Sequence, residues 1–218
     1  MRATIASKAA PADPIPARRV RVDLVDIPRQ RYLAVDGCER PGGQTFQNAI
    51  ATLYPIAYAL HFLLRKSGVK APIGALEGRY WITPEDAGDA IPGGEQRPAA
   101  PSRWQLVLPV PHEATEADVE QAICEAARRR TLPAMSRLRV VHWDEHTCAQ
   151  LLHVGPYASE APSLAKLREG IVRAGFEPIG PHHEIYLNDP RQVGEARAKT
   201  ILRLEVRPRT SRSPAGSD

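Results

Sequence analysis

A short motif occurs twice in this chain, about a hundred residues apart. Residues 72–81 read Pro-Ile-Gly-Ala-Leu-Glu-Gly-Arg-Tyr-Trp, and residues 178–190 read Pro-Ile-Gly-Pro-His-His-Glu-Ile-Tyr-Leu-Asn-Asp-Pro. In both copies the motif follows a strand pattern ending in glycine and then an apolar helix pattern. An internal repeat constrains the fold strongly, because neither half can bury its apolar surface alone. We therefore predict two related halves that pack against each other.

Each half is predicted to contain a strand, a helix and two further strands, in that order. The expected ranges are 32–37, 46–66, 72–81 and 104–108 in the first half, and 149–155, 160–174, 178–190 and 200–206 in the second. These patterns predict an α+β fold, with an antiparallel sheet, helices on one side and a ligand cleft between the halves.

The halves span about residues 22–110 and 138–206, within one domain at 22–206. A helix at 115–130 is expected to link them, starting at Thr115 with a capping box. Residues 140–143 and 148–154 are expected to pair as a hairpin. The tails at 1–21 and 207–218 are rich in proline, alanine or arginine and are expected to be disordered.

The charge distribution argues against a nucleic-acid partner. The chain has 218 residues, a net charge of +4 and a pI near 9.1. The two tails carry +4 and +2, so residues 22–206 carry −2. A nucleic-acid-binding fold would carry a basic stripe on its folded surface, and none is evident.

Other classes of protein are disfavoured by what the motifs lack. The apolar run at 49–64 is short and interrupted by Pro55, so a buried helix is expected and no membrane span. Three cysteines without a CxxC pair indicate reduced thiols and a cytoplasmic location. No phosphate-binding, dinucleotide or HExxH motif is present, so we predict no cofactor and no metal.

Glu184 is the strongest candidate for chemistry. On an ideal strand Glu184 and Tyr186 share one face, whereas Ile185 and Leu187 share the other. A buried carboxylate is costly unless it is paired or functional. It would suit a general base acting on water, or an anion that, together with aromatic faces, attracts cationic ligands. The alternative is a structural ion pair with an arginine.

A second group of candidates comes from the first copy of the motif. Because duplicated halves usually face each other, Glu77 and Glu184 are expected to be partners across one cleft. Alternation places Glu77 and Trp81 on one face and Tyr80 on the other, unless Gly78 forms a bulge. The alternative is a surface Glu77 with Trp81 in the core.

Four further side chains complete the predicted ligand site: Tyr54, Tyr58, Trp104 and His183. The tyrosines lie on one stripe of the first helix, and core packing is the alternative for both. One histidine of the pair His182 and His183 is expected to hydrogen-bond backbone or the facing strand. The pair His182 and His183 lacks a second ligand set of known spacing, which disfavours a metal. His153 is expected to orient a loop.

The chain contains five motifs: Phe46-x-x-Ala-Ile-x-x-Leu-Tyr54, Leu76-Glu-Gly-x-x-Trp81, His153-x-Gly-Pro-Tyr157-x-x-Glu160, His182-His-Glu-Ile-Tyr-Leu-x-Asp-Pro-Arg191 and Lys199-Thr-Ile-Leu-Arg203. Together they resemble the bacterial GyrI-like small-molecule-binding domain proteins of the GyrI/SOUL superfamily. The likeness covers about residues 22–206 and is closest to the stand-alone branch. The loop at 37–41 departs from the Gly-x-Gly-Asp-Pro that relatives tend to have.

The resemblance implies a cleft between the halves that receives bulky aromatic molecules, with Glu184 as the pocket glutamate. Some stand-alone members hydrolyse cyclopropanoid genotoxins, so xenobiotic detoxification by a hydrolase is the first functional hypothesis. Glu184 or Glu77 would activate the water, and Tyr186, Tyr80 or His183 would donate a proton. A non-catalytic drug binder or sensor and a gyrase-inhibitor-type interaction protein are the alternatives. The natural ligand, the oligomeric state and the role of the 86–102 loop stay open.

Overall fold

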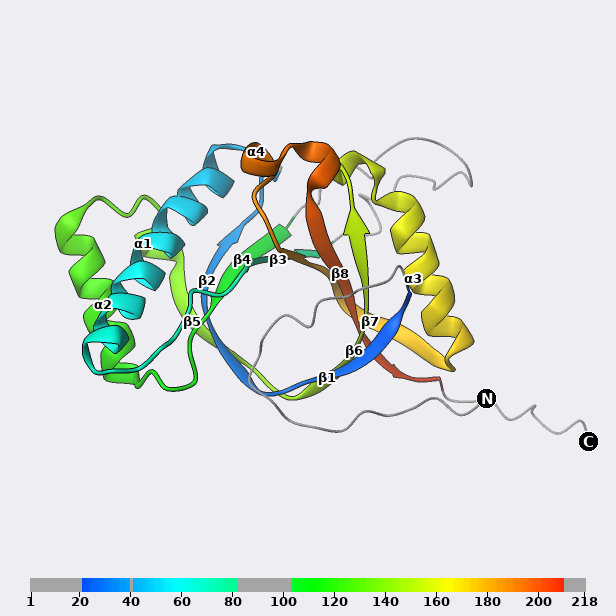
Figure 1. Cartoon of the computed structure of the whole chain (residues 1–218), viewed down its shortest axis with the longest axis horizontal. Helices are drawn as coiled ribbons and strands as arrows, with labels where there is room; N and C mark the ends of the chain where they lie inside the picture. Colours follow the sequence, from blue (N-terminus) through cyan, green and yellow to red (C-terminus); the bar gives the residue numbers. More distant parts are fainter. Residues whose placement is uncertain (1–20, 40, 82–102, 210–218) are drawn as a thin grey trace, which may run out of the picture.

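One antiparallel sheet of eight strands runs through the part of the chain that the structure describes (Figure 1). This structure is a computed structural model, and it describes residues 21–39, 41–81 and 103–209. The strands are β1 (Asp23–Ile27), β2 (Gln30–Gly37), β3 (Leu76–Trp81), β4 (Arg103–Pro109), β5 (Leu138–Trp143), β6 (His146–Val154), β7 (Phe176–Tyr186) and β8 (Lys199–Pro208). Their order in the sheet is β1-β6-β8-β7-β3-β4-β2-β5.

The longer helices are α1 (Gln44–Lys66), α2 (Glu116–Arg129) and α3 (Ala161–Arg173), and a short α4 spans Pro190–Val193. Three 3₁₀ turns occupy Met135–Arg137 (η1), Tyr157–Ser159 (η2) and Glu195–Arg197 (η3). The capping box expected at Thr115 is present, since Thr115 and Asp118 each accept a hydrogen bond from the other's backbone N–H. No helix in the described residues combines the length and apolarity that a membrane span requires. The predicted tails and the 86–102 loop lie almost entirely outside the described ranges.

The predicted duplication is confirmed by the order and pairing of the strands. The halves are β2-α1-β3-β4 and β6-α3-β7-β8, and they join where β3 pairs with β7. Aligning the two Pro-Ile-Gly motifs makes Gly78 the counterpart of Glu184. These two residues are also direct partners in the sheet. The approximate twofold axis that relates the halves therefore passes between Gly78 and Glu184.

The predicted hairpin between 140–143 and 148–154 is wrong. β5 pairs with β2 of the other half, and β1 pairs with β6. Each half thus gives its leading strand to its partner half. The packing of Trp143 explains the choice, because its ring lies 4.1 Å from the ring of Tyr32 on β2 and both join a small apolar cluster there.

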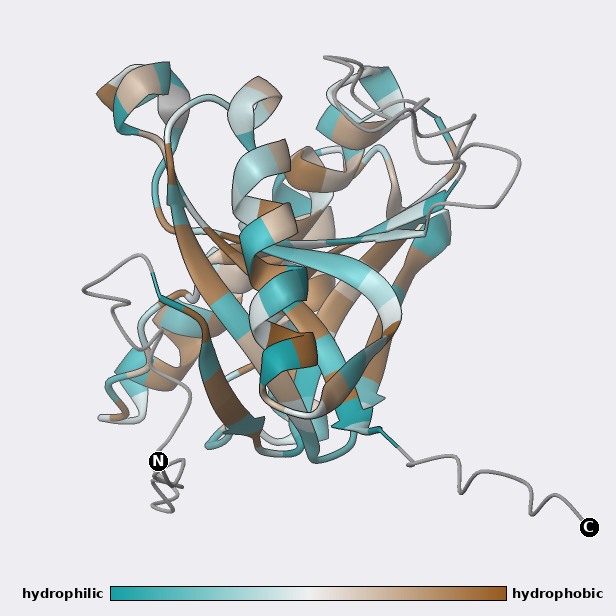
Figure 2. Ribbon diagram, turned by 90° about the vertical axis from the view of Figure 1, so that its right-hand side faces the viewer, coloured by the Kyte–Doolittle hydropathy of each residue, from teal (hydrophilic) through white to brown (hydrophobic). Residues whose placement is uncertain are grey.

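The helices α1 and α3 cover one face of the sheet, as predicted. α1 packs on a large apolar cluster with β2, β4 and α2, and α3 packs on a second cluster with β6 and β8. Figure 2 shows α3 in front of the sheet, with hydrophilic and hydrophobic residues mixed along it, as an amphipathic covering helix requires. We call this the helix face of the sheet. The seam between the halves runs along β3 and β7, between the areas that α1 and α3 cover.

Candidate functional site

Glu184 is a charged residue in an otherwise apolar row across the helix face. Residues that pair directly in antiparallel strands share a face, so the row can be followed from strand to strand. It reads Val35, Leu106, Gly78, Glu184, Leu202 and Leu151. Glu184 is only 8% exposed. A carboxylate at this place carries a large desolvation cost, and its neighbours must offset that cost.

Three side chains on the same face supply the hydrogen bonds. The hydroxyl of Tyr186 donates to Oε2 of Glu184 at 2.8 Å, and Nε2 of His182 lies 3.1 Å from Oε1. The hydroxyl of Tyr80 contacts that of Tyr186. Because Tyr186 has already given its only hydrogen to Glu184, Tyr80 must be the donor in that contact. Two tyrosines and a carboxylate therefore form one directed chain of hydrogen bonds.

Both tyrosines stay protonated and act as hydrogen-bond donors. Burial raises the pKa of Tyr80 and of Tyr186 well above the usual value, and the negative charge of Glu184 raises each further. A phenol under these conditions stays protonated at neutral pH. The chain can thus hold Glu184 as an anion, and a ligand oxygen on which charge develops can take the hydrogen bond of Tyr80 in place of the Tyr186 oxygen.

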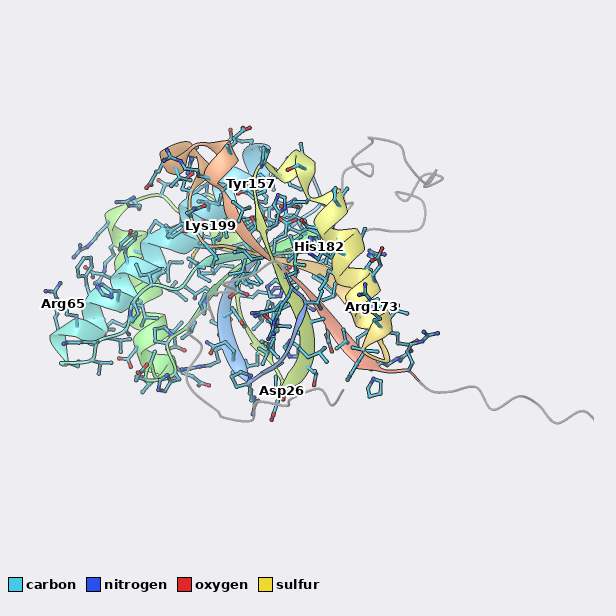
Figure 3. The ribbon with its side chains drawn as sticks, turned by 45° about the vertical axis from the view of Figure 1, so that its right-hand side comes forward. Asp26, Arg65, Tyr157, Arg173, His182 and Lys199 are labelled. Atoms are coloured by element: carbon cyan, nitrogen blue, oxygen red, sulfur yellow. The ribbon has the colours of Figure 1, made fainter. Side chains whose placement is uncertain are left out.

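A second layer of the site comes from the start of α3 and was not predicted as such. Tyr157 packs edge-on against Tyr186 at 5.8 Å between ring centroids, and its pKa is raised to about 12 by burial and by Glu184. Figure 3 shows Tyr157 and His182 toward the α3 side of the sheet, whereas Asp26 lies at the other end of the molecule. His153 orients the loop before η2, as expected, through contacts with Ser163 and the carbonyl of Pro156.

Glu160 joins this layer as a buried carboxylate at the beginning of α3. One ligand atom from each of Glu160, His182 and Glu184 lies within 4.8 Å of the others. Two carboxylates and an imidazole form a donor set that a divalent transition metal could accept. The signal in the sequence was the motif His153-x-Gly-Pro-Tyr157-x-x-Glu160, which served only to show the family likeness.

The expected single cleft with Glu77 opposite Glu184 is wrong, because the two glutamates lie on opposite faces. Glu77 pairs directly with Ile185, and its Oε2 lies 2.7 Å from Nε2 of His183. The reason is a one-residue offset. In the aligned repeats Glu77 matches His183, not Glu184, and a shift of one residue reverses the face of a strand. Trp81 also lies on this second face, as alternation predicted, and the pairing of β3 shows no bulge at Gly78.

The other predicted residues fall into the core or onto the rim. Trp104 is 1% exposed, packs against Phe46 and donates its ring N–H to the carbonyl of Glu39, so it is a core residue. Tyr54 is half-buried against the α1 core, and burial raises its pKa. Tyr58 follows one turn later and is 52% exposed. Tyr80 and Tyr186 are therefore the predicted aromatic residues that contact the Glu184 cluster directly.

Comparison with known proteins places this geometry in a family. The model of the GyrI-like small molecule binding domain matches residues 96–207, just over half of the chain. A search of curated proteins finds no significant match.

Among solved structures, an uncharacterized conserved protein from Listeria innocua is 29% identical, with a TM-score of 0.74, over 88% of this chain and 94% of that one. A structure described as a hydrolase from Listeria innocua is also 29% identical over the same shares, with a TM-score of 0.71. The C-terminal domain of EcmrR shares the fold, at 11% identity and a TM-score of 0.52 over 86% of this chain and 98% of that one. The chain therefore belongs to the GyrI-like small molecule binding domain family.

Proposed function

We propose that this protein binds an aromatic small molecule beside Glu184 and hydrolyses reactive, cyclopropanoid-type xenobiotics there. The observation that carries the proposal is the buried carboxylate in an apolar row, held by Tyr186 and His182. A carboxylate of this kind is expensive to keep, and a stable core would be better served by a leucine. The Listeria innocua relative described as a hydrolase adds support, since it is 29% identical over most of both chains.

The hydrolysis needs a base that takes a proton from water and a hydrogen-bond donor for the oxygen that receives the electron pair. Glu184 takes one proton from a water molecule as the oxygen attacks the methylene carbon of the cyclopropane. The C–C bond of the ring breaks, and its electron pair moves through the conjugated ring system to the carbonyl oxygen. The product is a phenol bearing a new hydroxyethyl-type arm, so the net change is addition of one water.

The tyrosine chain supplies the second requirement. Tyr80 and Tyr186 stay protonated because burial and Glu184 raise the pKa of both. Tyr80 stabilises the developing phenolate by turning its hydroxyl hydrogen from the oxygen of Tyr186 to the phenolate oxygen, and the proton held by Glu184 returns to the phenolate to complete the cycle. Release of ring strain lowers the activation barrier of the ring opening, so one general base and one hydrogen-bond donor are sufficient for catalysis.

The test is to incubate the purified chain with a spirocyclopropyl alkylator and follow the products by mass spectrometry. We expect the ring-opened product with one added water, and we expect Glu184→Gln to remove it. Glu177→Gln is the matched control, because this residue lies on the same strand in an exposed ion pair with Arg207. If the parent protein gives no product above the uncatalysed rate, hydrolysis is excluded.

A non-catalytic binder is the second candidate, and the hydrogen bonds of Glu184 favour it. Both carboxylate oxygens already accept a bond, from Tyr186 and His182, which suits a fixed anion that attracts a cationic aromatic ligand. Calorimetry with planar cationic compounds separates the two functions. Saturable binding that Glu184→Gln weakens, without any product, would identify a binder or sequestering protein.

A further inference from the structure

A hollow lies on the face of the sheet opposite to Glu184. Its volume is about 240 Å³, and β3, β5, β6, β7 and β8 all contribute to its lining. Figure 1 shows the outer strands curving round toward one another on this side. The volume corresponds to about eight water molecules, which is room for a small organic molecule. Neither the hydrolysis nor the aromatic ligand proposed above uses this hollow.

Arg79 lines the hollow with an unused set of donors. Its guanidinium lies 4.5 Å from the ring centroid of Trp143 and 5.4 Å from that of Trp81. Within the described part of the chain, the guanidinium of Arg79 makes no hydrogen bond and no ion pair. Burial lowers the pKa of Arg79, yet a guanidinium remains charged in proteins. A planar cation with five N–H groups therefore faces the hollow and can bind a carboxylate with two bonds.

Glu205 lines the same hollow with the opposite charge. It comes from β8 and is partly buried, and no side chain in the described ranges forms an ion pair or hydrogen bond with its carboxylate. Among the charges that favour the charged form of Arg79, that of Glu205 acts most strongly. The two groups are thus near enough to interact electrostatically but do not form an ion pair. Each retains an unpaired charge at a partly desolvated place, which is unfavourable without a ligand.

The remaining groups of the hollow decide what kind of ligand fits. Cys148 is buried and its pKa is raised to about 12, so its thiol is neutral. His183 is engaged with Glu77, and burial lowers its pKa. Asp144 and Glu145 add negative charge to the lining, which disfavours a simple anion. A simple cation would be repelled by Arg79.

We propose that this hollow is a binding site for a small zwitterion of the amino-carboxylic acid class. The carboxylate of the ligand binds the guanidinium of Arg79, and its ammonium group binds Glu205. The chain between the two groups lies against the ring of Trp143. A ligand of this kind satisfies both unpaired charges at once, which a molecule with a single charge cannot do.

Calorimetry of the full chain with a homologous series tests the proposal. The probes are glycine, β-alanine, γ-aminobutyrate and 5-aminovalerate, with acetate and methylammonium as single-charge controls. We expect one or two members of the series to bind saturably, because only some lengths span from Arg79 to Glu205. Each single-charge probe should bind about tenfold more weakly or worse. Failure of every zwitterion to saturate, or equal binding of acetate, overturns the proposal.

Variants connect the binding to the two charges. Arg79→Gln and Glu205→Gln should each weaken the best zwitterion about tenfold or more, and Glu177→Gln should leave it unchanged. Circular dichroism checks the fold of each variant. Should Arg79→Gln fail to fold, Arg79→Lys retains the charge without the planar fork and should bind more weakly than the parent. Unchanged binding in Glu205→Gln contradicts the proposal whatever happens at Arg79.

The two sites can be separated by the same measurements. Glu184→Gln should leave binding of the zwitterion unchanged, because Glu184 lies on the helix face. Conversely, Glu205→Gln should leave turnover or binding of the aromatic ligand unchanged. A failure of the proposed hydrolysis would therefore leave the proposed zwitterion site unaffected.

Discussion

The two faces of the β3–β7 pair hold the same kinds of group in different arrangements. On the second face Glu77 contacts His183, and these residues occupy equivalent places in the two halves. On the helix face Glu184 stands opposite Gly78, so its symmetry counterpart has no side chain. On the second face the two equivalent residues satisfy each other, whereas the helix face has a carboxylate without a matching residue. The departure from symmetry marks the candidate site.

The largest expected effect comes from replacing the unmatched carboxylate. Glu184→Leu would make the row across the helix face wholly apolar. Turnover of the cyclopropanoid should fall by at least about 100-fold, because the base is lost. The free energy of unfolding should fall by about 1–3 kcal/mol, because the hydroxyl of Tyr186 and Nε2 of His182 lose their acceptor. Denaturant unfolding and product formation measure the two quantities, and unchanged turnover would contradict the assignment.

The same substitution on the second face should lower stability without lowering turnover. Glu77→Leu leaves the buried ring of His183 without the acceptor that it contacts at 2.7 Å. The free energy of unfolding should fall by about 2–3 kcal/mol. Turnover should change little, because Glu77 does not lie on the helix face. A loss of turnover without a loss of stability would mean that both faces serve one site.

Replacing Gly78 by a residue with a side chain should be destabilising, and this tests whether the space opposite Glu184 must stay free. A Cβ added there would lie 2.6 Å from the hydroxyl oxygen of Tyr80. Gly78→Ala should therefore displace Tyr80 from Tyr186, lower turnover and cost about 1–3 kcal/mol of unfolding free energy. In a Tyr80→Leu background, the added cost of Gly78→Ala should shrink. An equal cost in both backgrounds would show that Tyr80 is not the obstacle.

The smallest expected effect is a pH dependence from the second face. Burial lowers the pKa of His183 below its usual 6.5, and this cause outweighs the opposing effect of Glu77. Between the lowered pKa and about 6.5 the unfolded chain binds more protons than the folded one, so stability rises with pH across this window. The slope from one group is at most about 1.4 kcal/mol per pH unit. His183→Gln should flatten the curve of unfolding free energy from pH 7 to 5, and an unchanged slope would contradict this account.

The sequence predicted much of the fold, because the repeated motif and the alternation within each strand are local signals. The grouping of Glu184 with Tyr186 follows from period-2 alternation alone. The position of Glu77 could not be obtained in the same way. The face on which Glu77 lies depends on how the two copies of the motif align. In that alignment Glu77 is offset by one residue from Glu184, and this offset places the two glutamates on opposite faces.

The strand exchange and the second layer were also beyond local reasoning. A short connection after Trp143 resembles a hairpin, but the ring of Tyr32 on a distant strand determines where β5 packs. Glu160 and Tyr157 enter the site through the path of α3 across the sheet, which no spacing in the sequence encodes. Contacts between elements that are distant in the sequence thus determine the pairing of β5 and the second layer of the site, which the residue pattern of each half does not predict.

The crossing of β1 and β5 also restricts how such a molecule could have arisen. A single ancestral unit made of five elements would have had no strand of its own beside the outer edge of its sheet. It could have covered that edge only by taking the strand from another copy, so the ancestor is expected to have been an interlocked homodimer. Gene fusion would then have tied together two polypeptides that were already dependent on each other. By the same logic, cutting the present chain between α2 and β5 should give two fragments that acquire structure only when they are mixed.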